Sequence, residues 1–294
     1  MKKKVLITGG SSGFGALTVK TLIENGHSVT ASMRNVEGKN KVNAEKMRSL
    51  GAHVVDIDVT NDHSVNTGVA KAIELMGGLD VVVNNAGIGV LGIQEQFSIE
   101  EFQRLFDVNV FGVQRVNKAA LPHLRAQGAG LLVQISSLLG RINLPFYSPY
   151  NASKWAVESI AEGYRLELSA FGVDSVIVEP GGFPTAFFDG LIQPKDKSTD
   201  ASYGPMADAP KQLFDSFEGA LASNPNQNPQ MVADAVLKLI ETPDGERPVR
   251  TPVDLMGMGE HVGPYNEHLD KIHEGILGSF GMGDMLKLKV NQEA

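Results

Sequence analysis

The sequence predicts an α/β fold built on a doubly wound, seven-stranded parallel sheet with helices on both faces. Short apolar runs alternate with segments of helical periodicity along most of the chain. Right-handed crossovers between parallel strands place the connecting helices on both faces of such a sheet. A glycine-rich turn also lies between the first strand and the first helix, which is typical of sheets that bind a ligand at their carboxyl edge.

The expected strands are short apolar runs bounded by glycine or polar residues: residues 5–7, a strand that begins at Val29, and residues 52–57, 79–83, 131–135, 173–178 and 247–251. The expected helices repeat apolar residues at helical spacing: the segment with Leu17, Leu22 and Ile23, and residues 38–50, 62–76, 99–127, 150–171 and 229–241. The strand at 79–83 is nearly continuous in β-branched residues, which favours burial on both faces of the sheet.

Two segments fall outside this alternation. Residues 183–228 contain five prolines among aromatic residues, which predicts a lid-like excursion packed over the sheet rather than a second domain. Residues 254–294 are rich in glycine and methionine and form a C-terminal extension. We therefore expect residues 1–294 to form a single domain.

Composition limits the function. The 294 residues carry a net charge of −8, which argues against a nucleic-acid partner because phosphate binding needs a basic face. The absence of cysteine excludes disulfides and zinc–thiolate sites and agrees with a reducing compartment. No apolar stretch is long enough for a signal peptide or a membrane span. We therefore expect a cytoplasmic protein.

The glycine-rich turn predicts a dinucleotide site. Residues 8–15 place three glycines in the spacing Gly-x-x-x-Gly-x-Gly. A pyrophosphate needs backbone N–H groups at a helix start with no side chains in the way. A turn selected only for its geometry is the alternative, but residues 84–87 at the end of the fourth strand favour the dinucleotide. We then expect a sheet of the Rossmann type and, in residues 1–294, a dinucleotide-binding catalytic domain.

Tyr150 and Lys154 form a candidate acid/base pair. They stand four residues apart at the start of a helix, so both project from the same face. A neighbouring cation stabilises a phenolate and lowers its pKa. An ordinary surface pair is the alternative. Ser137 changes that balance because it follows the fifth strand, at the edge where doubly wound sheets bind ligands, and its hydroxyl could polarise a carbonyl oxygen.

Taken in order, these motifs resemble the short-chain dehydrogenase/reductase family. The resemblance covers residues 4 to about 253 and rests on residues 8–15, Asp58, residues 84–87, Asn109, Ser137, Tyr150, Lys154, Pro180, Gly181 and Thr185. It implies a catalytic tetrad in which Tyr150 transfers the proton and Ser137 polarises the carbonyl. It further implies that Lys154 binds the nicotinamide ribose and that Asn109 holds a water.

The resemblance also implies the cofactor contacts. Asp58 and Val59 would lie at the adenine, residues 85–87 on the adenosine side and Thr185 at the carboxamide. The complete expected set is Thr8, Gly9, Ser11, Ser12, Gly13, Phe14, Gly15, Arg34, Asp58, Val59, Asn85, Ala86, Gly87, Tyr150, Lys154, Pro180, Gly181, Phe183 and Thr185. No metal site is expected.

The choice of cofactor depends on the end of the second strand. An acidic residue about twenty positions past the turn would bind a ribose 2′-hydroxyl and select NAD. Met33 stands in that place here with Arg34 beside it, and a guanidinium pairs bidentately with a 2′-phosphate. We therefore expect NADP(H), assisted by Lys39. NAD(H), with Glu37 as the acid, is the alternative.

Two apolar segments predict the substrate class. They are Leu138, Leu139, Ile142, Leu144, Phe146 and Tyr147 in one loop, and Phe183, Phe187, Phe188, Leu191, Leu213, Phe214 and Phe217 in the excursion. Such linings suit an apolar ligand with one reactive oxygen, although the same residues could simply anchor the excursion. The excursion and the extension also resemble the hydroxysteroid and retinol branch of the family.

We therefore expect an NADP(H)-dependent oxidoreductase that interconverts an alcohol with a ketone or aldehyde on a bulky apolar substrate. One alternative is a dinucleotide-sensing regulatory protein of the same fold that turns nothing over. Another is an epimerase or dehydratase of a longer-chain branch. The apolar helices at 102–124 and 155–171 predict a homodimer or homotetramer.

Overall fold

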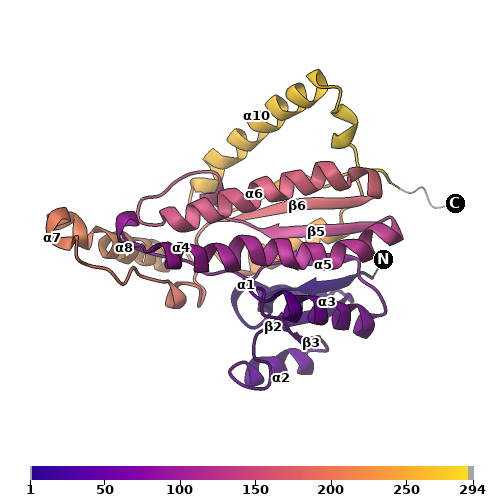
Figure 1. Ribbon diagram of the computed structural model, residues 1–294, viewed down its shortest axis with the longest axis horizontal. Coiled ribbons are helices and arrows are strands. Elements are labelled where there is room, and N and C mark those ends of the chain that lie inside the picture. The colour runs from indigo at the N-terminus through magenta and orange to yellow at the C-terminus, as the bar shows by residue number, and fades with distance from the viewer. Residues whose placement is uncertain (1, 291–294) are drawn as a thin grey trace.

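The computed structural model describes residues 2–290 and confirms the expected fold (Figure 1). All strands of the sheet run parallel, in the order β3-β2-β1-β4-β5-β6-β7. They are β1 (Lys4–Ile7), β2 (Ser28–Met33), β3 (His53–Asp56), β4 (Val81–Asn84), β5 (Gly130–Ile135), β6 (Val173–Pro180) and β7 (Arg250–Val253). The strand order reverses between β1 and β4, which is where sheets of this kind bind their ligands.

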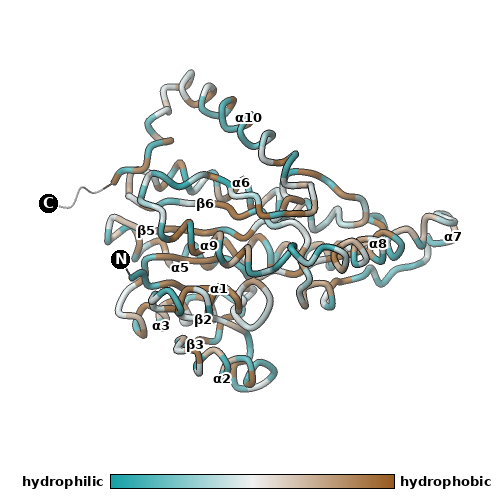
Figure 2. The backbone as a smooth tube through the Cα atoms, turned by 180° about the vertical axis from the view of Figure 1, so that it is seen from behind, coloured by the Kyte–Doolittle hydropathy of each residue, from teal (hydrophilic) through white to brown (hydrophobic). Residues whose placement is uncertain are grey.

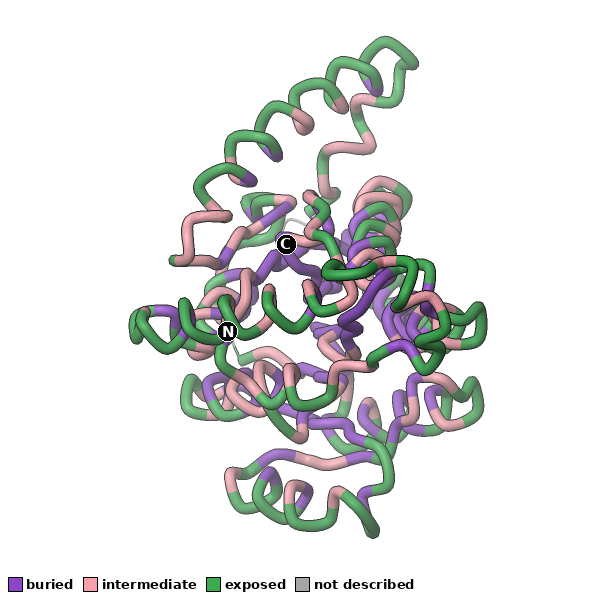
Figure 3. The backbone as a smooth tube through the Cα atoms, turned by 90° about the vertical axis from the view of Figure 1, so that its left-hand side faces the viewer, coloured by how far each residue is buried: buried purple, intermediate pink, exposed green. Residues whose placement is uncertain are grey.

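Helices cover both faces of the sheet. On one face lie α1 (Gly13–Glu24), α2 (Lys41–Ser49) and α9 (Gln230–Glu241), and on the other lie α3 (Asp62–Met76), α5 (Gly112–Gln127) and α6 (Ser148–Leu168). Val5 and Ile7 of β1 join the first apolar cluster and Leu6 joins the second, because successive strand residues point to opposite faces. Apolar residues therefore predominate in the inner strands (Figure 2), which are buried at the centre of the molecule (Figure 3).

The helix expected over residues 99–127 is interrupted at a position that bears on the site. It consists of α4 (Ile99–Phe106), a π-helical turn (Asp107–Phe111) and α5. The side chain of Asn109, inside the turn, accepts a hydrogen bond from the Ile88 N–H and donates one to the Ile88 carbonyl, both at 2.9 Å. Apolar spacing continues through the turn, so helical periodicity alone does not reveal it.

Other boundaries move by a few residues for local reasons. The helix expected at 38–50 begins only at Lys41, as α2. The residues before it form a turn instead, because the N–H groups of Gly38 and Asn40 both donate to the Asn35 carbonyl. The last strand begins at Arg250 rather than at residue 247. The Arg247 guanidinium is instead buried among polar partners and donates to the Leu239 carbonyl at 2.7 Å.

The excursion at 183–228 carries α7 (Asp200–Tyr203) and α8 (Ala209–Ser223), which project from the left of the molecule in Figure 1. Its first part is joined to the loop after β4 by a parallel bridge between Val90 and Ile192. Leu91 N–H donates to the Ile192 carbonyl at 2.9 Å, and Ile192 N–H donates to the Gly89 carbonyl at 3.0 Å. The excursion is therefore held beside the carboxyl ends of the strands.

The C-terminal extension forms a helix. Helix α10 (Met258–Ser279) leaves the sheet beside β7 and stands away from the body, with most of its surface exposed (Figures 1 and 3). The last residues of the chain, 291–294, lie outside the described part. Between residues 2 and 290, no helix combines the length and hydropathy that a membrane crossing requires.

Candidate active site

A cavity of about 430 Å³ opens where β1, β4, β5 and β6 end. Most of the expected site residues line it: Gly9, Ser11, Ser12, Gly13, Phe14, Arg34, Asp58, Val59, Asn85, Ala86, Gly87, Ser137, Tyr150, Lys154, Pro180, Gly181, Phe183 and Thr185. Thr8, Gly15 and Asn109 do not line it, and their contacts place them behind its wall. The parallel sheet thus brings residues from distant parts of the chain to one edge.

The glycine-rich turn leaves the start of α1 open toward this cavity. Gly9 and Gly13 have φ angles of +68° and +52°, a region that favours glycine. A Cβ added at Gly15 would lie 2.2 Å from the Gly9 carbonyl oxygen, so a side chain does not fit there. The first turn of α1 carries no acidic residue, and the Ser12 side chain makes no capping bond. These features fit a dinucleotide phosphate.

The Thr8 hydroxyl fixes this turn to the loop after β4. It accepts hydrogen bonds from the backbone N–H groups of Asn85 and Ala86, both at 3.0 Å. The Asn85 amide returns a bond to the Thr8 carbonyl at 2.9 Å. A Cβ on Gly9 would come within 3.0 Å of Ala86 Cα. The expected contact residue Thr8 therefore acts on the cavity by holding its two backbone walls together.

Lys154 and Tyr150 lie side by side at the floor of the cavity. The buried Lys154 ammonium donates to the Ile135 carbonyl at 2.8 Å and lies 5.6 Å from the centre of the Tyr150 ring. Burial lowers the pKa of Lys154 to about 8, opposed by the negative charge of Glu158. Burial raises the pKa of the Tyr150 phenol, and a hydrogen bond with Ser137 offsets part of that rise.

The direction of the Tyr150 shift differs from the sequence expectation. A neighbouring cation was expected to lower the pKa of the phenol, whereas burial raises it here. The phenol is therefore protonated at neutral pH, which suits a group that gives up a proton to a reduced substrate.

Ser137 and Asn109 complete the expected tetrad in different ways. The Ser137 hydroxyl accepts from the Leu139 N–H at 3.1 Å and donates to the Pro180 carbonyl at 3.4 Å, at the wall of the cavity. The Asn109 amide is engaged with the Ile88 backbone, and it also donates to the Ser153 hydroxyl at 3.1 Å. Its side chain therefore fixes the loop after β4 against α6.

Arg34 and Asp58 line the end of the cavity beyond the glycine-rich turn. Burial opposes ionisation of Asp58, but hydrogen bonds from the Thr60 N–H and hydroxyl, at 3.0 and 2.7 Å, leave its pKa below the usual value. The Glu37 carboxylate does not line the cavity and instead faces the Arg48 guanidinium at 3.6 Å. The basic residue, and not the alternative acid, thus lines the cavity.

The other end of the cavity is apolar. It is lined by Leu138, Leu139, Leu144 and Tyr147 from the loop, and by Phe183, Phe187, Phe188, Leu191, Leu213 and Phe217 from the excursion. Ile142, Phe146 and Phe214 were also expected to line it and do not. Phe214 packs against Phe188 with ring centres 5.8 Å apart, which places it one layer behind the lining. The Phe187 ring lies 5.8 Å from that of Tyr150.

Several lining residues were not expected from the sequence, among them Asn40, Ile57 and Met258. Asn40 donates to the Arg34 carbonyl at 2.6 Å and so supports the position of Arg34. Met258 is the first residue of α10, which brings the C-terminal extension to the cavity. No periodicity or motif marks these positions. In the described part of the chain, no three His, Asp or Glu side chains gather as metal ligands would.

A parallel sheet that presents a phosphate-binding turn and a Ser–Tyr–Lys group along one cavity defines a nucleotide-binding oxidoreductase of the Rossmann fold. Comparison with known sequences agrees, because residues 3–196 match the short chain dehydrogenase family. The chain belongs to the short-chain dehydrogenase/reductase family, which acts on alcohol and carbonyl groups and binds NAD(P)(H).

Individual relatives cover different shares of the chain. A 3-ketodihydrosphingosine reductase of Bacteroides thetaiotaomicron is 40% identical over 185 residues, which are 63% of this chain and 65% of that protein. Retinol dehydrogenase 8 of Bos taurus is 34% identical over 248 residues, 81% of this chain and 78% of that one. A short-chain dehydrogenase structure from Streptomyces avermitilis superposes with a TM-score of 0.73 at 28% identity, covering 96% and 99% of the two chains.

The fit at Gly15 gives a test of the cofactor site. We expect Gly15→Ala to weaken NADPH binding by roughly tenfold or more, because the added methyl must displace the turn that carries the phosphate-facing N–H groups. Gly163→Ala in α6 is the matched control, since nothing lies within 4 Å of its added Cβ. Fluorescence titration with NADPH would measure both. Equal affinities of the two variants would exclude the turn from cofactor binding.

Proposed function

We propose that the protein is an NADP(H)-dependent oxidoreductase that interconverts an alcohol with a ketone or aldehyde on a bulky apolar substrate. The observation that carries this proposal is the meeting of Ser137, Tyr150 and Lys154 with an aromatic wall in one cavity. In this proposal, residues 1–294 act as a single catalytic domain. The names of the two relatives support the substrate class, because 3-ketodihydrosphingosine and retinol are both largely apolar molecules with few reactive oxygens.

The proposed chemistry assigns one task to each side chain. A bound nicotinamide supplies or accepts the hydride. The Ser137 hydroxyl and the Tyr150 phenol hold the substrate oxygen, and Tyr150 transfers the proton to it during reduction. The Lys154 ammonium stabilises the phenolate that remains, because its Nζ lies beside the Tyr150 ring. Asn109 and Thr8 keep the surrounding backbone in place.

Replacing Tyr150 by phenylalanine tests the proton-transfer role. We expect Tyr150→Phe to lower kcat by about 10² to 10⁴, the usual contribution of a positioned general acid, and to leave NADPH affinity nearly unchanged. Steady-state kinetics on a carbonyl that the wild type reduces would measure the first, and fluorescence titration the second. Tyr164→Phe is the matched control on the same helix. A loss in kcat smaller than tenfold would remove Tyr150 from the mechanism.

A wild-type protein that binds NADPH but reduces no ketone or aldehyde would contradict the enzymatic proposal. The dinucleotide-sensing protein would then be the better description, so a broad panel of carbonyl compounds belongs in the first experiment.

The preference for NADP(H) rests on Arg34. Its side chain lines the cavity while the Glu37 carboxylate is turned toward Arg48. A guanidinium can form charge-assisted hydrogen bonds with a 2′-phosphate, which NAD lacks. This arrangement favours NADP(H) over NAD(H).

Replacing Arg34 by alanine tests this preference. Only NADPH loses a charged hydrogen bond, which contributes about 1.5 to 3 kcal/mol. We therefore expect Arg34→Ala to weaken the binding of NADPH by roughly tenfold or more and to change the binding of NADH little. Calorimetric titration with both cofactors would measure the difference, and Lys41→Ala at the exposed start of α2 is the control. If the binding of NADPH and the binding of NADH weakened equally, Arg34 would have no part in selecting the 2′-phosphate.

The excursion at 183–228 acts as a lid in this proposal. Phe187 and Phe188 reach the cavity from it, and the Phe187 ring lies against Tyr150. An apolar substrate would replace part of this aromatic contact and hold the excursion closed over the reacting carbonyl.

The lid predicts a dependence on substrate length. Each buried methylene contributes about 0.8 kcal/mol, roughly fourfold, so four added methylenes could raise kcat/KM by up to about two orders of magnitude. A series of methyl ketones or aldehydes with NADPH would measure this slope. Phe187→Ala and Phe188→Ala should flatten the slope, whereas Phe280→Ala, on an exposed side chain beyond α10, should not. A flat slope in the wild type, or faster reduction of sugars, would reject the lipophilic assignment.

We also propose that the protein is a homodimer or homotetramer. Phe111 and Phe171, on and beside the helices that suggested association, have large exposed fractions of 53% and 49%. Burying such side chains between copies would stabilise a closed assembly. Light scattering at micromolar concentration should give at least twice the mass of one chain, and Phe111→Asp should lower that mass. A wild-type mass of one chain would refute the proposal.

A further inference from the structure

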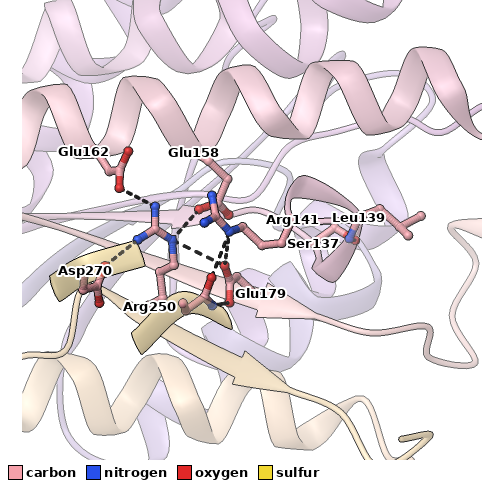
Figure 4. Close-up of polar contacts among 9 residues, drawn as sticks. Ser137, Leu139, Arg141, Glu158, Glu162, Glu179, Arg250 and Asp270 are labelled. Carbon is pink, nitrogen blue, oxygen red and sulfur yellow. Dashed lines mark hydrogen bonds and ion pairs between the residues drawn. The ribbon is translucent and has the colours of Figure 1, made fainter. Parts of the chain in front are cut away.

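Four charged side chains are buried together behind Ser137 and Lys154, and the proposed chemistry does not use them. They are Arg141, Glu158, Glu179 and Arg250, with exposed fractions of 6%, 2%, 0% and 6%. They come from the turn after β5, from α6, from β6 and from β7, and they point toward one another (Figure 4). We call them the charge cluster. Buried charges persist only when they are paired, so their partners define what the cluster does.

Arg250 is the centre of the charge cluster. Its Nε donates to Glu158 at 2.9 Å and lies 3.6 Å from Glu179. Its two terminal nitrogens donate to Glu162 at 2.6 Å and to Asp270 at 3.1 Å. Asp270 belongs to α10, so the helix that stands away from the body is fastened to the buried charges behind the active site.

Asn266 gives α10 a second and more specific connection. Its side chain is 4% exposed, and its two ends have different partners. Its oxygen accepts from Arg141 Nε at 2.8 Å, and its nitrogen donates to Glu179 at 2.7 Å. Only a primary amide side chain of this length can accept from the guanidinium and donate to the carboxylate in these positions.

Both partners of Asn266 are next to the proposed catalytic groups. Arg141 ends the short turn that begins at Ser137, and within that turn the Leu139 N–H donates to the Ser137 hydroxyl. Glu179 directly precedes Pro180, whose carbonyl accepts from the same hydroxyl at 3.4 Å. A single amide of α10 therefore joins the two segments that hold Ser137.

Lys154 is within the influence of the same cluster. Glu158 lies one helical turn beyond it on α6, and the charge of Glu158 raises the pKa of Lys154 against the effect of burial. A Cβ added at Gly140 would lie 2.8 Å from the Ser136 hydroxyl and 3.1 Å from Glu158 Cγ, which shows how closely the turn after Ser137 packs on Glu158.

We propose that Asn266 is a positioning residue, through which α10 fixes the Ser137 turn relative to the Pro180–Gly181 end of β6 and so sets the geometry of the reduction. This inference rests on the proposed function of Ser137 and Tyr150. Misplacing a reacting group by about 1 Å can cost about 10² in rate, so a bridge of two hydrogen bonds at this location can control turnover without touching the substrate.

The sole tryptophan supplies a readout that does not depend on turnover. The Arg141 guanidinium lies 5.8 Å from the Trp155 ring and 4.9 Å from the Tyr265 ring, so it sits between α6 and α10. Trp155 fluorescence therefore reports where Arg141 is. Loss of the Asn266 oxygen should release Arg141 and change both the emission maximum and the accessibility of Trp155 to a soluble quencher.

The experiment compares Asn266→Ala and Asn266→Asp with Glu267→Ala, a control on the exposed side of the same helix. Asn266→Asp keeps an acceptor for Arg141 but places a second carboxylate beside Glu179. NADP⁺ titration first gives the fraction of each protein that binds cofactor. Per binding site, we expect both Asn266 variants to lose roughly tenfold or more in kcat with KM for NADPH changed less than about threefold, and Glu267→Ala to match the wild type.

The fluorescence arm uses NADP⁺, which does not absorb at the wavelengths of tryptophan emission. We expect saturating NADP⁺ to change Trp155 emission in the wild type and in Glu267→Ala, and to have no such effect in Asn266→Ala. An Asn266→Ala protein with wild-type kcat per binding site and a wild-type NADP⁺ response would overturn the inference. If that variant binds no cofactor, Asn266→Asp decides by its kcat per binding site alone, because its retained oxygen can still hold Arg141 beside Trp155.

These arms separate the inference from the proposed function. If the wild type reduces no carbonyl, or if Tyr150→Phe keeps its activity, the proposed function fails while the fluorescence response still decides whether α10 is coupled to the cofactor site. If the wild type is active and Tyr150→Phe is not, an unchanged Asn266→Ala rejects the positioning role alone.

Discussion

The buried ammonium of Lys154 sets the conditions that the rest of the site must meet. A cation removed from water needs hydrogen-bond acceptors and negative charge close by, or it loses its proton. The Ile135 carbonyl, at the end of β5, supplies the acceptor, and Glu158 supplies the charge from the next turn of the same helix. Both depend on α6 lying directly against the end of the sheet. The charged state of Lys154 thus depends on the end of β5, on α6 and on the buried carboxylate of Glu158 together.

The parallel sheet makes this arrangement possible because it gathers the carboxyl ends of consecutive strands. The turn after β1 binds the loop after β4 through Thr8, and the turn after β5 binds the end of β6 through Ser137. Each junction is a side-chain hydroxyl bonded to a neighbouring backbone. The cavity is therefore surrounded by backbone segments that cannot move independently, which is the condition for holding a ligand and a reacting group in register.

The sequence was sufficient to predict the sheet, the glycine-rich turn and the Ser–Tyr–Lys group, because each has a local signature of spacing or periodicity. It was not sufficient for the π-helical turn around Asn109. The hydrogen bonds between the Asn109 side chain and the Ile88 backbone accompany this turn but leave the apolar spacing of the helix unchanged. Asn266 was also missed. Its partner Arg141 lies 125 residues away, and a lone asparagine in an extension with little apolar periodicity carries no local signal. The direction of the Tyr150 pKa depended on burial, which only the packed structure reveals.

The polar contacts of Asn266 and Asp270, which hold α10 to the charge cluster, have a consequence for how this protein can diverge. Removing one member of a buried ion pair typically costs about 3–5 kcal/mol, whereas replacing the whole group by apolar residues can be neutral. Arg250 has acidic neighbours on α6, β6 and α10, so a single substitution of Arg250 leaves the buried carboxylates of Glu158 and Glu179 without this partner. Changes there must accumulate together across distant parts of the chain. We therefore expect α10 to change together with the strands that hold its polar side chains, even though it shares little contact surface with the sheet.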